Sequence, residues 1–326
     1  MDSSPKDKLL AFKPQHSFFV GIDSDGCVFD TMEIKHKECF IPNIIKHWNL
    51  QAISKYARAA AEFVNLYSKW RGINRFPALT KALELLRDWP EPMRRGVKLP
   101  DWTPLQKWID SGATLGNPAL EAEVAKTGDP ALKRTLDWST AVNRAIAEMV
   151  EGVPPFPYFR ESVERLARNA DIICVSATPG EALEREWQEH DIARFAAVIA
   201  GQEMGSKKEH LKLAAGEKYE KNRVLMIGDA PGDLAAARAN GALFYPINPG
   251  REDASWERFD HGLLSSAQRT NLYSGHMTAL WHKAPSSLLE FGNIDKIRLF
   301  AHKRGESSET ILLDSTSDSL DFEHTL

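Results

Sequence analysis

Two aspartates two residues apart, Asp23 and Asp25, are the residues best suited by type and spacing to do chemistry. They directly follow the apolar run Phe18–Ile22, whose polar flanks and short length are typical of a buried parallel strand. Gly26 comes next and lets the backbone approach a ligand closely. The pair could cap a turn or hold a structural ion, but neighbouring carboxylates repel each other and suit Mg²⁺, which prefers oxygen ligands. The segment therefore predicts a metal-assisted site at the carboxyl end of a strand, where open α/β sheets bind ligands.

A second acidic pair follows another predicted strand. The run Arg223–Ile227 leads into Asp229 and Asp233, and the helix-forming stretch Leu234–Asn240 comes next. Gly241 fits a C-cap that ends this helix. Because parallel strands of one sheet share their carboxyl edge, we expect the two acidic pairs to surround one spot.

A third apolar run, Asp171–Val175, ends in a segment suited to bind an anion. Ser176 and Ala177 follow this predicted strand and precede the helical stretch Glu181–His190. A hydroxyl and free backbone N–H groups at the start of a helix form an anion site. Alternatively, Ser176 could simply cap the helix.

Two adjacent lysines follow a fourth apolar stretch, Phe195–Ala200. Lys207 and Lys208 stand at the beginning of another predicted helix, where a lysine can neutralise a bound phosphate. Only one of two adjacent side chains is expected to face the site. We favour Lys207, which is nearer the helix start, and expect Lys208 to be a solvated charge.

These segments resemble, in order, the four motifs of the haloacid dehalogenase (HAD) superfamily. Each motif stands at the end of a predicted strand with helical stretches between, so the set is more specific than any one motif. The matching residues are Asp23-x-Asp25-Gly26, Ser176, Lys207 or Lys208, and Gly228-Asp229-x-x-x-Asp233. The resemblance implies an α/β fold, with a Rossmann-like parallel sheet core and a large all-helical cap domain.

The resemblance also implies roles for the acidic residues. Asp23 would attack phosphorus and form an aspartyl-phosphate, a covalent strategy open to carboxylates. Asp25 would protonate the leaving oxygen and then activate water, which contributes roughly 10²–10⁴-fold to a rate. The carboxylates of Asp23 and Asp229 and the backbone carbonyl of Asp25 would hold Mg²⁺. Relatives that cleave carbon–halogen bonds lack the second aspartate, so Asp25 indicates phosphate esters.

The other motif residues would position the phosphoryl group, and positioning with electrostatics supplies most of the rate in phosphoryl transfer. Ser176, Ala177 and Lys207 would bind its oxygens. Asp233 would orient the lysine or a metal-bound water. Gly26 and Lys208 would have supporting places only.

The resulting hypothesis is a Mg²⁺-dependent phosphatase acting on a small phosphorylated metabolite. One alternative is a sugar-phosphate phosphomutase, because Asp30-Thr31-x-Glu33 followed by Lys35-His36 resembles the start of the cap in such enzymes. The other is a catalytically silent protein that binds phosphorylated ligands, since a fold alone does not fix a function.

The composition is that of an ordinary soluble globular chain, with 326 residues, 43% hydrophobic residues and a net charge of −4. There is no basic excess and no zinc-type Cys/His spacing, so we expect no nucleic-acid partner. The first 17 residues contain no long apolar run, so we expect neither a signal peptide nor a membrane span. Three widely spaced cysteines suit a reducing cytosol. A cytoplasmic enzyme with no membrane partner is expected, and the oligomeric state is not predicted.

The chain length favours more than one unit. We expect an α/β core from residues 1–30 and 152–265, with a helical cap, 31–151, between its first two motifs. Residues 266–304 would form a C-terminal extension packed on the core. The acidic stretch 305–326 would be a flexible tail in which Ile311–Leu313 could pair as a short edge strand.

The cap sequence is rich in helix formers, and six of the nine tryptophans fall in it. Helical spacing is clearest in Ile53–Tyr67, Pro77–Arg87 and Ala141–Val150. Loops are expected near Pro90–Pro92 and Gly112–Pro118. The cationic or titratable residues that could contact the non-reacting end of a substrate are Lys35, His36, Arg71 and Arg75.

Beyond the fourth motif, the core is expected to continue with one more strand and one more helix. Ala242–Ile247 has the pattern of a fifth parallel strand, and a helix is expected to start at Ser255.

Overall fold

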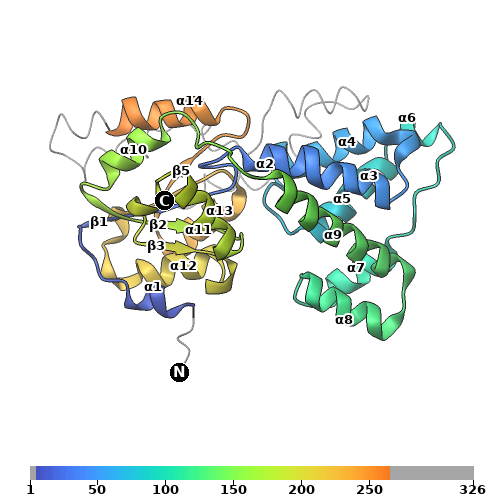
Figure 1. Cartoon of the computed structure of the whole chain (residues 1–326), viewed down its shortest axis with the longest axis horizontal. Helices are drawn as coiled ribbons and strands as arrows, with labels where there is room; N and C mark the ends of the chain where they lie inside the picture. Colours follow the sequence, from blue (N-terminus) through green and yellow to red (C-terminus); the bar gives the residue numbers. More distant parts are fainter. Residues whose placement is uncertain (1–4, 265–326) are drawn as a thin grey trace, which may run out of the picture. The chain divides into compact units, whose positions relative to one another are not determined.

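The computed structural model describes residues 5–264. They form two compact units, one made of residues 5–31 and 152–264 and the other of residues 32–151 (Figure 1). The expected C-terminal extension, the tail and the short strand at Ile311–Leu313 lie outside the described residues. In the part of the chain that is described, no helix is long and apolar enough to span a bilayer.

The first unit is built on a parallel sheet of five strands in the order β3-β2-β1-β4-β5. Its strands are β1 Phe18–Ile22, β2 Ala170–Val175, β3 Val198–Ala200, β4 Val224–Gly228 and β5 Leu243–Pro246. The central strand is therefore the one that precedes the first acidic pair, and its neighbour β4 precedes the second. The predicted α/β fold with a Rossmann-like parallel core is confirmed.

The strands are almost continuously apolar because helices cover both faces of the sheet (Figure 1). Successive side chains point to opposite faces, so Phe19 and Val20 enter different hydrophobic layers. Val20 packs in the layer that contains Trp187 and Trp256. Phe19 packs in the opposite layer with Leu211.

Three helices supply each layer. The layer around Val20 receives side chains from α10 Phe159–Leu166, α11 Gly180–Glu189 and α14 Glu252–Glu257, which continues as a π-helix over Arg258–Leu264. The layer around Phe19 receives side chains from α1 Asp7–Ala11, α12 Lys207–Ala214 and α13 Pro231–Asn240.

Several helix boundaries differ from expectation. α13 begins at Pro231 rather than Leu234, because proline is well tolerated in the first turn of a helix. It ends at Gly241, whose φ of 64° confirms the predicted C-cap. The prediction of a helix start at Ser255 was wrong by three residues, since α14 begins at Glu252.

The two segments of the first unit that flank the second unit are joined by backbone hydrogen bonds. Phe29 and Pro155 form an isolated antiparallel bridge. The N–H of Phe156 donates to the carbonyl of Val28 at 2.8 Å. The segments that leave and re-enter the first unit are therefore held side by side.

Residues 32–151 contain helices and no strand, as expected for this segment. From α2, which starts in the first unit, the elements are α2 Thr31–Ile34, a π-helix Lys35–Phe40, α3 Ile41–His47, a 3₁₀ turn Gln51–Ile53, α4 Ser54–Glu62, a π-helix Phe63–Tyr67, α5 Arg75–Arg87, α6 Pro90–Met93, α7 Thr103–Asp110, α8 Asn117–Thr127 and α9 Pro130–Met149. The loop expected at Pro90–Pro92 is instead one helical turn, because a proline at the first position needs no backbone donor. The predicted helix Ala141–Val150 is only the second half of α9.

Aromatic side chains fill the core of the second unit, as its tryptophan content suggested. Trp48, Trp89, Trp108 and Trp138 are buried there, and Phe76 meets Trp108 edge to face at a centroid distance of 5.2 Å. Such edge-to-face pairs contribute beyond the apolar area that they bury.

Candidate active site

The carboxyl edge of the sheet brings three buried carboxylates together. β1 pairs with β4 so that Ile22 lies opposite Ile227, and the N–H of Asp23 donates to the carbonyl of Ile227 at 3.0 Å. Asp23 and Asp229 therefore leave adjacent strands at the same level, and Asp233 joins them from the first turn of α13. One oxygen from each of these three carboxylates lies within 4.8 Å of the others. We call Asp23, Asp229 and Asp233 the carboxylate cluster.

Gly228 makes room for the third member of this cluster. A Cβ atom at Gly228 would stand 2.4 Å from the Cβ of Asp233, so no larger residue fits without moving that aspartate. Asp233 also accepts a hydrogen bond from the N–H of Ala230 at 3.1 Å. The spacing of the fourth motif thus has a steric reason.

Lys207 reaches into the carboxylate cluster and Lys208 does not. The Nζ of Lys207 lies 2.7 Å from Asp23 Oδ2 and 2.6 Å from Asp233 Oδ1. Lys207 is the first residue of α12, which Ser206 caps in a capping box with Glu209. The side chain of Lys208 is exposed.

The charges in the cluster are unbalanced. Burial raises the pKa of Asp23, and although the ammonium group of Lys207 lowers it, Asp233 and Asp229 raise it further. Burial likewise raises the pKa of Asp233. Burial alone would lower the pKa of Lys207, but the carboxylates outweigh it and raise that pKa. Three carboxylates against one ammonium leave two negative charges when all are ionised, which a divalent cation would balance.

The donor set fits Mg²⁺. The cluster offers only oxygen ligands, and Mg²⁺ is commonly bound through one or two carboxylates together with substrate phosphates. Asp23 and Asp229 are the predicted carboxylate ligands, and both are almost fully buried.

Asp25 stands apart from the carboxylate cluster and is held by two hydroxyl groups. The hydroxyl of Thr31 donates to its Oδ1, and the hydroxyl of Thr178 donates to its Oδ2 at 2.7 Å. Gly26 follows with a φ of 74°, a left-handed conformation that favours glycine and lets the chain turn.

The segment after β2 has one feature that the sequence did not predict. Ser176 is buried, and its hydroxyl accepts from the N–H of Thr178 at 3.2 Å, whereas Ala177 is exposed. Gly180, the first residue of α11, donates its N–H to Glu203 Oε2 at 3.0 Å. The expectation of free N–H groups at this helix start was therefore wrong for Gly180, because a carboxylate from the next loop already occupies it.

Two buried indole groups donate hydrogen bonds to the loop after β1. Trp187 Nε1 donates to Ser24 Oγ at 3.0 Å, and Trp256 Nε1 donates to the carbonyl of Cys27 at 2.7 Å. Burial raises the pKa of the Cys27 thiol, with nearby carboxylates adding to the effect, so Cys27 packs rather than reacts.

Sequence reasoning missed Thr31, Thr178 and Glu203 as parts of the site. Thr178 could have been found, because it is a hydroxyl residue in the same strand-end segment as Ser176. Glu203 could not, because its partner is a backbone N–H that only the folded sheet brings near.

Three of the four residues named as possible substrate contacts in the second unit make contacts within it. Arg71 is buried and donates to the carbonyl of Leu66 at 3.0 Å. Arg75 donates to the hydroxyl of Ser139 at 3.0 Å, and His36 stacks on a neighbouring phenylalanine. A role for Lys35, His36, Arg71 or Arg75 in binding substrate stays a prediction.

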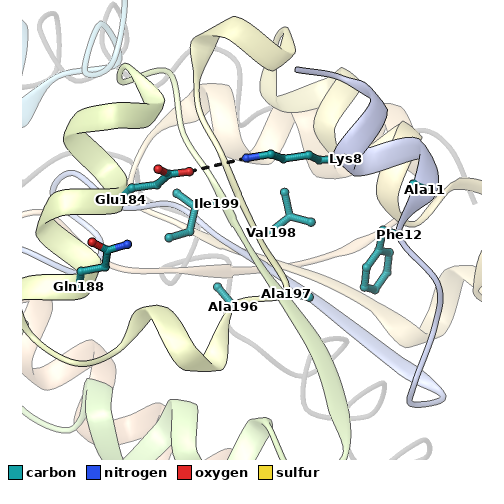
Figure 2. A pocket seen from close by; sticks show the side chains of 9 residues that line it. All are labelled: Lys8, Ala11, Phe12, Glu184, Gln188, Ala196, Ala197, Val198 and Ile199. Atoms are coloured by element: carbon teal, nitrogen blue, oxygen red, sulfur yellow. Dashed lines mark ion pairs between the residues drawn. The ribbon is translucent and has the colours of Figure 1, made fainter. Parts of the chain in front are cut away.

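A separate pocket of about 560 Å³ lies beside strand β3. Figure 2 shows Lys8 from α1 and Glu184 from α11 reaching toward each other across this strand, with 3.9 Å between their charged atoms. None of the lining residues belongs to the predicted site. The pocket is thus distinct from the carboxylate cluster.

Solved structures to which the chain is similar include the following three. A haloacid dehalogenase-like family hydrolase from Streptococcus pneumoniae is 15% identical, with 74% of this chain and 90% of that chain covered and a TM-score of 0.38. A predicted phosphoglycolate phosphatase from Haemophilus somnus is 12% identical, with 72% and 86% covered and a TM-score of 0.40. A candidate beta-phosphoglucomutase from Thermotoga maritima is 14% identical, with 74% and 99% covered and a TM-score of 0.37.

Sequence comparison places the chain in a family. No curated protein matches it. The family described as haloacid dehalogenase-like hydrolase matches residues 20–241, a span that runs from β1 through α13 and covers all four motifs. The chain belongs to the haloacid dehalogenase-like hydrolase family.

Proposed function

We propose that this hydrolase cleaves phosphate monoesters of small metabolites with Mg²⁺, through an aspartyl-phosphate on Asp23. The observation that carries the proposal is the buried carboxylate cluster, in which Asp23 lies 2.7 Å from the ammonium group of Lys207. A carboxylate so placed can meet an incoming phosphoryl group only where positive charge offsets the repulsion.

The proposed reaction has two halves. In the first, a carboxylate oxygen of Asp23 bonds to phosphorus, the bond from phosphorus to the leaving oxygen breaks, and Asp25 gives that oxygen its proton. In the second, Asp25 takes a proton from water, the water oxygen bonds to phosphorus, and the bond to Asp23 breaks. The products are an alcohol and inorganic phosphate, with both aspartates restored.

The surrounding residues divide the work of holding the phosphoryl group. Ser176, Ala177 and Lys207 are proposed to bind its oxygens. Asp233 lies 2.6 Å from the Nζ of Lys207 and would keep that side chain directed at the site. With one end of Lys207 held, less rotational freedom is lost when phosphate binds.

Mg²⁺ would be held by Asp23, Asp229 and the carbonyl of Asp25, and when bound it would offset the repulsion between nucleophile and substrate. The carboxylate cluster supports this assignment because Asp23 and Asp229 are buried beside each other.

The cellular setting is also a proposal. Cys27, Cys39 and Cys174 are all free and buried. Free thiols persist in a reducing compartment, which supports a cytoplasmic location.

The proposed function is tested by Mg²⁺-dependent phosphate release from a panel of phosphorylated metabolites. Wild type is compared with Asp23→Asn, which keeps the shape but removes the nucleophilic charge, and with Asp253→Asn, an exposed control of the same chemistry. Release by wild type and the control, but not by Asp23→Asn, is expected. Transfer of phosphate between positions of a sugar without net release would indicate a mutase instead. Binding without any labelling of Asp23 would indicate a silent binder.

A further inference from the structure

We propose that Thr178 is a positioning residue for Asp25, and that the loop Gly201–Glu203 keeps Thr178 in place. This inference rests on the proposed phosphatase function. It concerns how the acid and base group is aimed, which neither the motifs nor the family match assigns.

The first observation is the contact itself. The hydroxyl of Thr178 donates to Asp25 Oδ2 at 2.7 Å, from a segment 153 residues away in the chain. The hydroxyl of Thr31 donates to the other oxygen. A hydrogen bond to each oxygen fixes the plane of the carboxyl group, which a single contact would leave free to rotate.

The chemistry of a hydroxyl group suits both the ionised and the protonated form of Asp25. A threonine hydroxyl can donate to a carboxylate or, after rotating, accept from a carboxylic acid. Thr178 can therefore hold Asp25 both before and after the proton is delivered. Valine has the same shape but can do neither, whereas serine can do both.

The second observation is that the next loop clamps the backbone of Thr178. The N–H of Gln202 donates to the carbonyl of Thr178 at 3.0 Å. Glu203 accepts from Gly180, two residues further on, at 3.0 Å. The N–H of Thr178 is held from the other side by Ser176 Oγ at 3.2 Å.

Gly201 is what lets the two loops come so close. A Cβ atom there would stand 2.5 Å from the backbone nitrogen of Gly180 and 2.8 Å from the carbonyl oxygen of Thr178. Its φ of −94° is open to any residue, so the need for glycine is steric rather than conformational. Gly216 offers a matched control, because a Cβ atom there would meet nothing within 4 Å.

The experiment uses leaving groups that differ in their need for a proton. An alkyl phosphate requires Asp25 to protonate its leaving oxygen, whereas the phenolate of p-nitrophenyl phosphate departs without that help. For Thr178→Val we expect kcat/KM to fall about 10-fold to 100-fold on the alkyl phosphate and less than about 3-fold on p-nitrophenyl phosphate. The inhibition constant of inorganic phosphate should stay within about 2-fold, because the phosphate contacts remain.

Thr178→Ser should restore the alkyl phosphate activity to within about 3-fold of wild type, because its hydroxyl can replace the lost one. Gly201→Ala should reproduce the preference of Thr178→Val for the aryl substrate, and Gly216→Ala should leave both activities unchanged. Equal losses on the two substrates, or no recovery with serine, would overturn the positioning role. If wild type releases phosphate from neither of these two substrates nor from any member of the metabolite panel, the proposed function is wrong, and the positioning role is wrong with it.

Discussion

Two ends of the same sheet bury aspartates in opposite ways. At the carboxyl edge, the three members of the carboxylate cluster share one lysine. At the other end, Asp171 lies near the start of β2 and accepts hydrogen bonds from the N–H groups of Gln15 and His16, at 2.9 Å each, and from the hydroxyl of Tyr219 at 2.6 Å. Both Asp23 and Asp171 are nearly inaccessible, at 4% and 6% exposed, but different groups surround them.

The difference lies in the donors that each carboxylate receives. Burial acts to raise the pKa of Asp171, but the hydrogen bonds from Tyr219, His16 and Gln15 outweigh it and lower that pKa. For Asp23, burial and neighbouring carboxylates win over Lys207 and raise the pKa. The satisfied carboxylate of Asp171 fastens the segment before β1 to the sheet, whereas the repelled carboxylate of Asp23 is where we propose that a cation and a substrate bind.

The largest effect should follow from removing charge at the carboxyl edge. Asp229→Asn takes away a predicted Mg²⁺ ligand, so phosphate release should fall by at least about 100-fold. The same change relieves repulsion, so the free energy of unfolding in the presence of a chelator should rise by about 1 kcal/mol. Phosphate release and urea denaturation measure the two. A destabilised variant would contradict the idea that the cluster is held under repulsion.

Removing the charge of Asp171, at the other end of the sheet, should instead lower stability and leave activity unchanged. Asp171→Asn replaces acceptor lone pairs by an amide that cannot satisfy all its donors, and should lower the free energy of unfolding by about 2–3 kcal/mol. The activity of the folded protein should not change. Tyr219→Phe, which removes one hydrogen bond, should cost about 1 kcal/mol and serves as a graded control. Equal stability of wild type and Asp171→Asn would refute the fastening role.

A buried histidine differs from both aspartates, because burial favours its neutral form. His210 is fully buried, and burial lowers its pKa to about 4, against 6.5 when unfolded. As the pH falls below 6.5 the unfolded chain takes up the proton and the folded one does not, so stability is lost in that window. The loss should reach about 2 kcal/mol between pH 6.5 and about pH 4.5. Denaturation across this range should show a shallower decline for His210→Gln, and an unchanged decline would contradict the assignment.

Binding of the cation itself should have a small effect on stability. Mg²⁺ at ten times its Kd should add about 1.4 kcal/mol to the free energy of unfolding. We expect this gain in Asp171→Asn, whose cluster is intact, and not in Asp229→Asn. Thermal unfolding with and without Mg²⁺ measures it, and equal gains in both variants would place the cation elsewhere.

The strands and the acidic residues at their ends could be predicted from the sequence because both signals are local. An apolar run followed at once by Asp23, or by Asp229, needs no knowledge of the rest of the chain. From the sequence, Asp171 is recognisable only as the start of a strand, because its donors come from residues 15, 16 and 219 and meet it only in the folded protein.

The second unit shows the same limit. Helical spacing predicts the second half of α9 but not the first half, although Asp129 caps this helix and Pro130 is its first residue. A capping aspartate followed by a proline is a local signal for the start of a helix, whereas helical spacing describes only its interior. The substrate could not be predicted, because none of the four motifs describes the residues that would contact its non-reacting end.

The second unit is an insertion in the first, and the bridge between Phe29 and Pro155 holds the two ends of the insertion together. Strands β1 and β2 are neighbours in space but more than a hundred residues apart in sequence, and closing so long a loop costs entropy that grows with its length. Once the second unit has folded with its two ends held together, the first unit has to close only the short distance between those ends, so the entropy cost of closing the loop is small. We therefore expect the first unit to keep its fold when residues 32–151 are replaced by another compact unit whose two ends lie equally close.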